Sequence, residues 1–67
     1  MIALSPSQQK VYDAIANFQN DNGYTPTLRV LGDQLSMSQW TVAAHVRKII
    51  EKGRARRVSS HHIELTG

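Results

Sequence analysis

Apolar residues recur in this chain at helical spacing in three separate stretches, which predicts three helices. The first stretch follows Ser5, where a capping serine, a proline and a glutamine three residues on make a strong helix start, and it ends in the polar run 20–23. The second helix is expected at about 28–35 and the third at about 39–52. The positions expected to face inward are Val11, Ile15, Phe18, Leu28, Leu31, Leu35, Val42, Val46 and Ile49.

A short turn between the second and third helices predicts a helix-turn-helix unit. Gly32 lies in the middle of the second helix, where a glycine costs about 1 kcal/mol relative to alanine. The usual compensation is close approach by another backbone, here expected from the start of the third helix. Met37 in the turn is expected to be buried. A third helix held in this way projects its outer face away from the domain.

The end of the chain predicts a β-hairpin. Two short segments, Ala55–Val58 and His62–Leu65, flank a tight turn at 59–61. Three helices followed by a hairpin predict a mainly α fold, the winged helix-turn-helix. With 67 residues and no internal linker or repeat, residues 1–67 are expected to form one small domain.

Positive charge is concentrated around the end of the third helix. The chain has a formal net charge of +3, yet residues 47–57 contain six of its eight basic residues and one acid, Glu51. A cluster of this kind favours a polyanion as partner. The carboxyl end of a helix attracts cations, which accounts for Lys48 and Lys52 but not for the three arginines beyond the helix.

Several other classes of protein are not expected. The chain has no cysteine, which excludes disulfides and thiolate metal sites, and it has no long apolar run, so no membrane partner is expected. The first residues lack the features of a signal peptide, which favours a cytoplasmic protein. The five acids are scattered and no glycine-rich phosphate loop is present, so we expect neither an enzyme nor a cofactor. Adjacent strand residues such as His61 and His62 point to opposite faces, so no metal site is expected.

Several spaced motifs resemble the amino-terminal DNA-binding domain of LexA-type repressors, over roughly residues 3–65. The resemblance implies a winged helix-turn-helix that reads operator DNA with its third helix. The motifs are Gln8-Gln9-x-Val11, Gly23-Tyr24-Thr25-Pro26-Thr27, Leu31-Gly32-x-x-Leu35 and His45-Val46-x-Lys48-x-x-x-Lys52-Gly53.

Three departures from this family limit what the resemblance implies. The sequence ends at Gly67, before any Ser/Lys self-cleaving and dimerising domain, so a stand-alone domain is expected, without self-cleavage. The family typically opens its recognition helix with a Ser-Pro-Asn-like sequence, whereas this chain has Ser38-Gln39-Trp40. The wing is also shorter and richer in arginine. A different operator sequence is therefore expected.

The residues expected to read bases lie at the start or on the outer face of the third helix. Gln39 can pair bidentately with adenine, and Thr41 and Ala44 can contact a thymine methyl group. For Trp40 two alternatives stay open, namely packing within or between subunits and direct contact with sugar or base. The candidates are Ser38, Gln39, Trp40, Thr41 and Ala44.

The residues expected to contact phosphates are spread over helix ends and the hairpin. Thr27 and Arg29 begin the second helix, whose amino terminus attracts anions. Strand alternation sends Arg56 and Arg57 to opposite faces, and Arg57 with the hairpin tip is the stronger candidate. The candidates are Thr27, Arg29, Lys48, Arg56, Arg57, Ser60 and His61.

Together these patterns predict a sequence-specific regulator of transcription that binds double-stranded DNA, either a repressor or a phage-type accessory regulator. The third helix would enter the major groove and the wing would contact the backbone. One alternative is a winged-helix module that binds another regulator, because Ile2, Val30 and Trp40 are apolar outside the expected core. A homodimer on two half-sites would cover them too. Another alternative is a small architectural DNA-binding protein, such as a recombination directionality factor.

Overall fold

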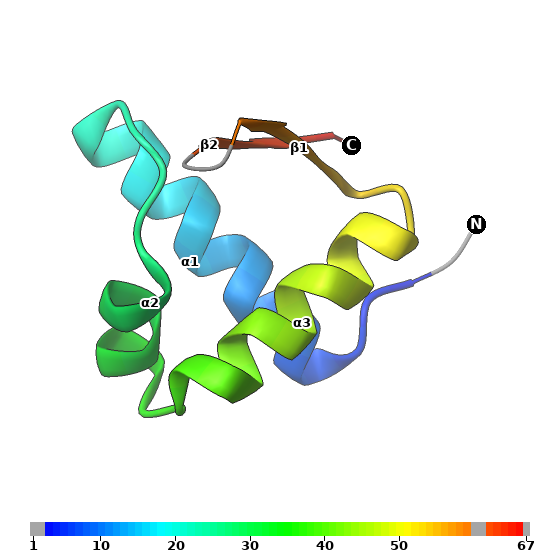
Figure 1. Cartoon of the computed structure of the whole chain (residues 1–67), viewed down its shortest axis with the longest axis horizontal. Coiled ribbons are helices and arrows are strands. Elements are labelled where there is room, and N and C mark those ends of the chain that lie inside the picture. The colour runs from blue at the N-terminus through cyan, green and yellow to red at the C-terminus, as the bar shows by residue number, and fades with distance from the viewer. Residues whose placement is uncertain (1–2, 60–61, 67) are drawn as a thin grey trace.

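The computed structural model describes residues 3–59 and 62–66. Within them, three helices precede a two-stranded antiparallel sheet, and Figure 1 shows this sheet lying across one side of the helices. The predicted winged helix-turn-helix is therefore confirmed. No helix among these residues is long and apolar enough to cross a membrane. The elements are α1 (Pro6–Asn22), α2 (Leu28–Leu35), α3 (Gln39–Glu51), β1 (Ala55–Ser59) and β2 (His62–Leu65).

Helix α1 begins and ends as the sequence predicts. The Ser5 side chain accepts a hydrogen bond from the Gln8 backbone N–H at 3.3 Å, and Gln8 Oε1 accepts one from the Ser5 N–H at 3.1 Å. This reciprocal pair is a capping box, which satisfies two amide groups that have no partner inside the helix. At the other end Gly23, with φ of 78°, stops the helix and donates its N–H to the Gln19 carbonyl.

The turn between α2 and α3 packs directly against Gly32. A Cβ atom placed on Gly32 would lie 2.6 Å from the carbonyl oxygen of Met37, and the Met37 N–H donates to the Gly32 carbonyl at 2.9 Å. Ser36 reverses the chain with φ of 57°. The predicted close approach is confirmed, although the nearest atom belongs to the turn, and α3 itself comes next with Gln39 N at 3.8 Å.

The hydrophobic core lies between the three helices and the inner face of the sheet. Six of the nine positions predicted to face inward are fully buried or nearly so, and two sheet residues complete the core. Its members are Val11, Ile15, Leu31, Val42, Val46, Ile49, Ala55 and Ile63.

The remaining predictions of burial need correction. Leu28 is 38 % exposed because it opens α2, beside the groove described below. Phe18 is half-buried, since its ring packs edge-on against Tyr24 with 5.3 Å between centroids. Leu35 and Met37 are also only half-buried. Val30, expected to lie outside the core, is half-buried, so it does not support a separate interaction surface. Ile2, expected to be exposed as well, lies outside the described residues.

The sheet confirms the predicted hairpin and fixes which side chains face the helices. Ala55 pairs with Leu65, Arg56 with Glu64 and Arg57 with Ile63. A register shift between Arg57 and Ser59 then interrupts the simple alternation. Because Ala55 and Ile63 are buried, the face that carries Ala55 and Arg57 is the face turned toward the helices.

Candidate nucleic-acid interface

Every predicted contact residue in the described part of the chain is exposed. The structure places five of them at the cap or on the outer face of α3, two at the start of α2 and two on β1, with Lys48 near the end of α3. Ser60 and His61 lie outside the described residues. The ten exposed residues are Thr27, Arg29, Ser38, Gln39, Trp40, Thr41, Ala44, Lys48, Arg56 and Arg57.

At the cap of α3, two of the predicted base-reading residues are hydrogen-bonded to each other. Ser38 Oγ accepts a hydrogen bond from the Thr41 N–H at 3.2 Å, and the two hydroxyl groups lie 2.9 Å apart. These bonds fix the first turn of the helix. The exposed amide of Gln39 forms no hydrogen bond within residues 3–59 and 62–66, so it is free to contact a ligand.

Trp40 does not pack in the core of its own chain. The residue is 87 % exposed, so packing within its own chain is excluded. The alternatives that stay open are contact with DNA and contact with another protein. Together with Leu28, Gln39 and Ala43, Trp40 lines a shallow hollow of about 480 Å³ at the start of α3. Because an exposed indole is costly to leave in water, this hollow is a candidate contact surface.

A larger groove of about 560 Å³ runs between the start of α2, α3 and the wing. Its floor includes core residues such as Leu31 and Val46, while Thr27 lies at the α2 side, Arg47 on α3 and Arg57 on the wing. Leu28 and Ala43 line both this groove and the hollow, so the two form one continuous face. We call it the groove face.

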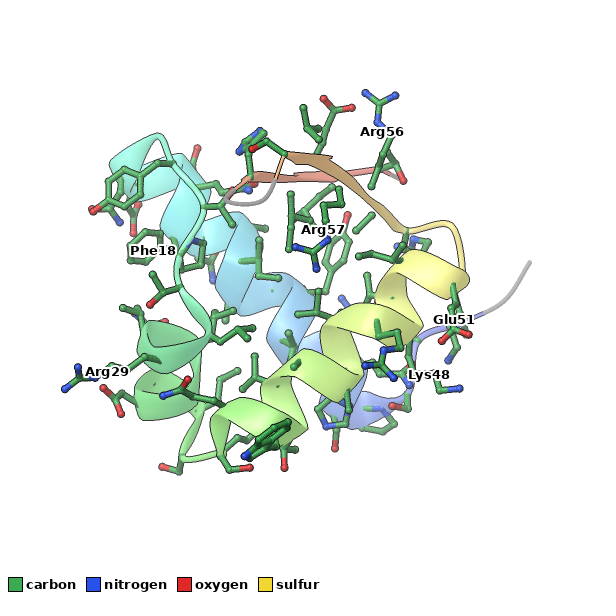
Figure 2. All side chains as sticks on the ribbon, in the orientation of Figure 1. Phe18, Arg29, Lys48, Glu51, Arg56 and Arg57 are labelled. Carbon is green, nitrogen blue, oxygen red and sulfur yellow. The ribbon has the colours of Figure 1, made fainter. Side chains whose placement is uncertain are left out.

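The two wing arginines lie on opposite faces of the sheet, as strand alternation predicts. Figure 2 shows Arg57 pointing from β1 toward α3, whereas Arg56 points away from the helices. Arg56 also forms an ion pair with Glu64 across the strands, with 2.9 Å between Nη2 and Oε1. Only Arg57 of this pair therefore contributes its charge to the groove face.

Two members of the basic cluster seen in the sequence make contacts within the domain. Lys52 Nζ donates to the Ala3 carbonyl at 3.1 Å and to Gln8 Oε1 at 2.6 Å, which ties the end of α3 to the cap of α1. Arg54 lies over the Tyr12 ring, 5.4 Å from its centroid. Within the cluster of basic residues, Lys52 and Arg54 therefore help to hold the domain together.

Two further candidates differ in their value as phosphate contacts. Figure 2 shows Arg29 pointing outward from α2, away from α3 and the wing, so the structure does not bring it to the groove face. Lys48 lies 3.7 Å from Glu51 in an exposed pair, which costs little to break. Sequence reasoning missed Arg47, whose position four residues after Ala43 on one helix face was the available signal.

One hydroxyl group holds the wing against the helical core. Thr25 Oγ1 accepts from Gln19 Nε2 and from the Ile63 N–H, each at 3.1 Å, and lies 2.8 Å from His62 Nδ1. Gln19 Nε2 donates also to the Ile63 carbonyl at 2.7 Å. Since both lone pairs of the hydroxyl are used, its own proton is available for His62. This arrangement was not predicted from the sequence.

No group of three metal-ligating side chains occurs among residues 3–59 and 62–66. What the structure assembles instead is an exposed helix beside a wing, with arginines from both elements on one face. These features define the winged helix-turn-helix class, whose members place such a helix against nucleic acid.

Comparison with known proteins places the chain more narrowly. The sequence model of the LexA DNA binding domain matches residues 1–62, and the chain belongs to this family. The LexA repressor of Herpetosiphon aurantiacus is 41% identical over 68 residues, which cover 97% of this chain and 32% of that protein. LexA repressor 1 of Geobacter sulfurreducens is 40% identical over 70 residues, covering 100% and 35% respectively. The chain thus spans about a third of the length of the curated relatives it matches.

Proposed function

We propose that this chain is the sequence-specific, double-stranded DNA-binding part of a transcriptional repressor. The observation that carries the proposal is the groove face, where Gln39 and Arg47 of α3 lie on the same side as Arg57 of the wing. The family membership and the names of both relatives support it. The family is named for DNA binding, and both relatives are named repressors.

The proposed docking mode places α3 in the major groove, which is about 12 Å wide and admits one helix. Gln39 would read base edges, Ala44 and Trp40 would make apolar contacts, and Ser38 with Thr41 would hold the first turn of the helix in place. Phosphates would be contacted by the start of α2 at Thr27 and by basic side chains on either side of the helix. These are Arg47, Lys48 and Arg57. Arg29 and Arg56 point away from this face, so they are left out of the docking mode, and the candidates Ser60 and His61 lie outside the described residues.

The test compares two adjacent arginines that lie on opposite faces of the wing. Arg57→Gln should lower the magnitude of the salt slope, d log K/d log[salt], by about 0.9, which is the value for one lost phosphate contact. Arg56→Gln is the matched control, since it removes the same charge from the outer face and should leave the slope nearly unchanged. Both variants are compared by titration of a duplex at several salt concentrations.

Equal effects of the two variants would contradict the proposed docking face. A binding constant that does not respond to salt would contradict DNA binding altogether, because phosphate neutralisation releases counterions from any duplex. Both arginines are exposed and the Arg56–Glu64 pair is 67% and 49% exposed, so neither change is expected to unfold the domain.

A second candidate function follows from Trp40. An indole that is 87 % exposed is as well suited to a protein partner as to DNA. The two functions are distinguished by the fluorescence of this single tryptophan. A change on adding duplex DNA supports the reader, whereas a change only with protein concentration or with another regulator supports an interaction module. A homodimer on two half-sites would give both responses.

A further inference from the structure

The start of α3 presents apolar surface where a helix that reads bases needs chemical complementarity to the groove. Four large hydrophobic residues are conspicuously exposed among the described residues, and two of them, Leu28 and Trp40, line the same hollow. Ala43 lies three residues after Trp40 and completes the apolar lining. Residues from two different elements therefore converge on one small apolar site, with Gln39 at its edge.

The polar groups of this turn limit how it can read bases. The hydroxyls of Ser38 and Thr41 bond to each other, and Thr41 N–H is also taken by the cap. The Gln39 amide and the Trp40 indole N–H are then the side-chain groups of this turn that form no hydrogen bond within the described part of the chain. One amide cannot specify several base pairs by hydrogen bonds. The apolar lining beside it can supply further discrimination.

The major groove offers one apolar feature in unmodified DNA, the C5 methyl group of thymine. It lies on the same groove edge as the N6 and N7 atoms of adenine that a glutamine pairs with. The groove beside the hollow is lined by Arg47, Arg57 and one acid, Glu51, so its charge is positive on balance. This positive charge suits DNA as the occupant rather than a second apolar surface.

We propose that the hollow formed by Leu28, Gln39, Trp40 and Ala43 is a receptor for the C5 methyl groups of thymines in the major groove. Trp40 and Leu28 are the specificity-determining residues, and Gln39 reads an adjacent adenine. This inference rests on the proposed function. It gives the site a defined chemical preference, namely A·T pairs with a thymine methyl directed at α3.

The test uses deoxyuridine, which keeps the hydrogen-bonding groups of thymine and lacks its methyl group. A duplex selected by the full chain from a random pool is resynthesised with each thymine replaced in turn. At one or two thymines per half-site, the replacement should weaken binding by about fourfold, the factor for removing one buried methyl group. The same replacements are then measured with Trp40→Ala and with Leu28→Ala, where the penalty should disappear.

Arg57→Gln is the matched control variant. It should weaken binding to every duplex and keep the full deoxyuridine penalty, because it removes a phosphate contact and leaves the hollow intact. Leu28 is partly and Trp40 almost fully exposed, so both alanine variants should fold, as circular dichroism would verify.

The outcomes separate the inference from the function on which it rests. If the chain binds DNA selectively and deoxyuridine weakens binding at no position, the inference about thymine methyl groups is wrong. The proposed function as a sequence-specific DNA-binding domain is then unaffected. A penalty that persists in both alanine variants assigns the methyl contact to other residues and also overturns the inference. A folded chain that binds no duplex at low salt overturns the proposed function itself. Loss of self-association in Trp40→Ala, with an unchanged penalty, would assign the hollow to a protein interface.

Discussion

At Gly32 the chain has room for a hydrogen atom but not for a methyl group. The position lies in a helix, where alanine is ordinarily better than glycine by about 1 kcal/mol. Here the backbone oxygen of Met37 would be 2.6 Å from the added carbon. A backbone atom cannot rotate away as a flexible side chain can, so α2 and α3 would have to separate.

Gly32→Ala should therefore lower the free energy of unfolding by about 1–3 kcal/mol, the usual cost of overpacking. Asp33→Ala, at an exposed position of the same helix, is the control and should change stability little. Urea unfolding followed by circular dichroism measures both. A Gly32→Ala variant as stable as the parent would show that the turn is not held by this contact.

Lys48 and Lys52 look alike in the sequence but have different environments. Lys52→Met should lower the free energy of unfolding by about 1–2 kcal/mol, because it removes charged hydrogen bonds to the Ala3 carbonyl and to Gln8. It should leave the salt slope of DNA binding unchanged. Lys48→Met should do the reverse, with little effect on stability and a slope reduced by about 0.9. Urea unfolding and salt titration of both variants test this exchange of roles, and identical behaviour would contradict it.

At the level of elements, the wing depends on the helical core for its position. A two-stranded hairpin is marginally stable by itself. Here Ala55 and Ile63 anchor its inner face in the core, and Thr25 in the α1–α2 loop fixes β2 by hydrogen bonds to Ile63 and His62. The direction in which Arg57 points is thus determined in part by a loop that lies 32 residues earlier in the chain.

Thr25→Val should loosen the wing, because it leaves the Ile63 N–H and one Gln19 proton without their acceptor while preserving side-chain shape. We expect a loss of about 1–3 kcal/mol in stability, faster amide hydrogen exchange in β2 and weaker DNA binding. Thr25→Ser keeps the hydroxyl and should restore most of these properties. If amide hydrogen exchange in β2 were the same in the parent, the Thr25→Val variant and the Thr25→Ser variant, the Thr25 hydroxyl would have no role in holding the wing.

The elements that could be predicted from the sequence are those specified by nearby residues. The amino-terminal caps at Ser5, Thr27 and Ser38 each use a partner three residues away, and the starts of all three helices follow from them. The roles of Lys52 and Thr25 could not be predicted from the sequence, because most of their partners lie between 37 and 49 positions away along the chain. The exception is Gln19, a partner of Thr25 that lies nearby in the sequence.

The candidate site could also be predicted only in part from the sequence. Helical periodicity identified the outer face of α3, but a count of charges along the chain could not tell Arg47, which lines the groove, from Arg54, which lies over Tyr12. The convergence of Leu28 with Trp40 likewise depends on how α2 crosses α3. These distinctions require the packed structure.

At the scale of the whole molecule, the groove face is small. A single DNA-binding module buries about 600–1,000 Å² on DNA, so useful affinity is expected to need two copies on paired half-sites. The relatives are about three times as long as this chain, and the chain itself matches the LexA DNA binding domain over residues 1–62. The domain is therefore expected to supply sequence preference, with a second copy of the chain supplying affinity.

The most direct test of the account is selection of bound duplexes from a randomised pool at about 150 mM salt, where purely electrostatic binding is weak. We predict enrichment of one motif that contains A·T pairs, and a palindromic motif if two copies bind together. If folded protein enriches no motif, the chain is not a sequence-specific reader, and a protein-interaction or architectural role would replace it.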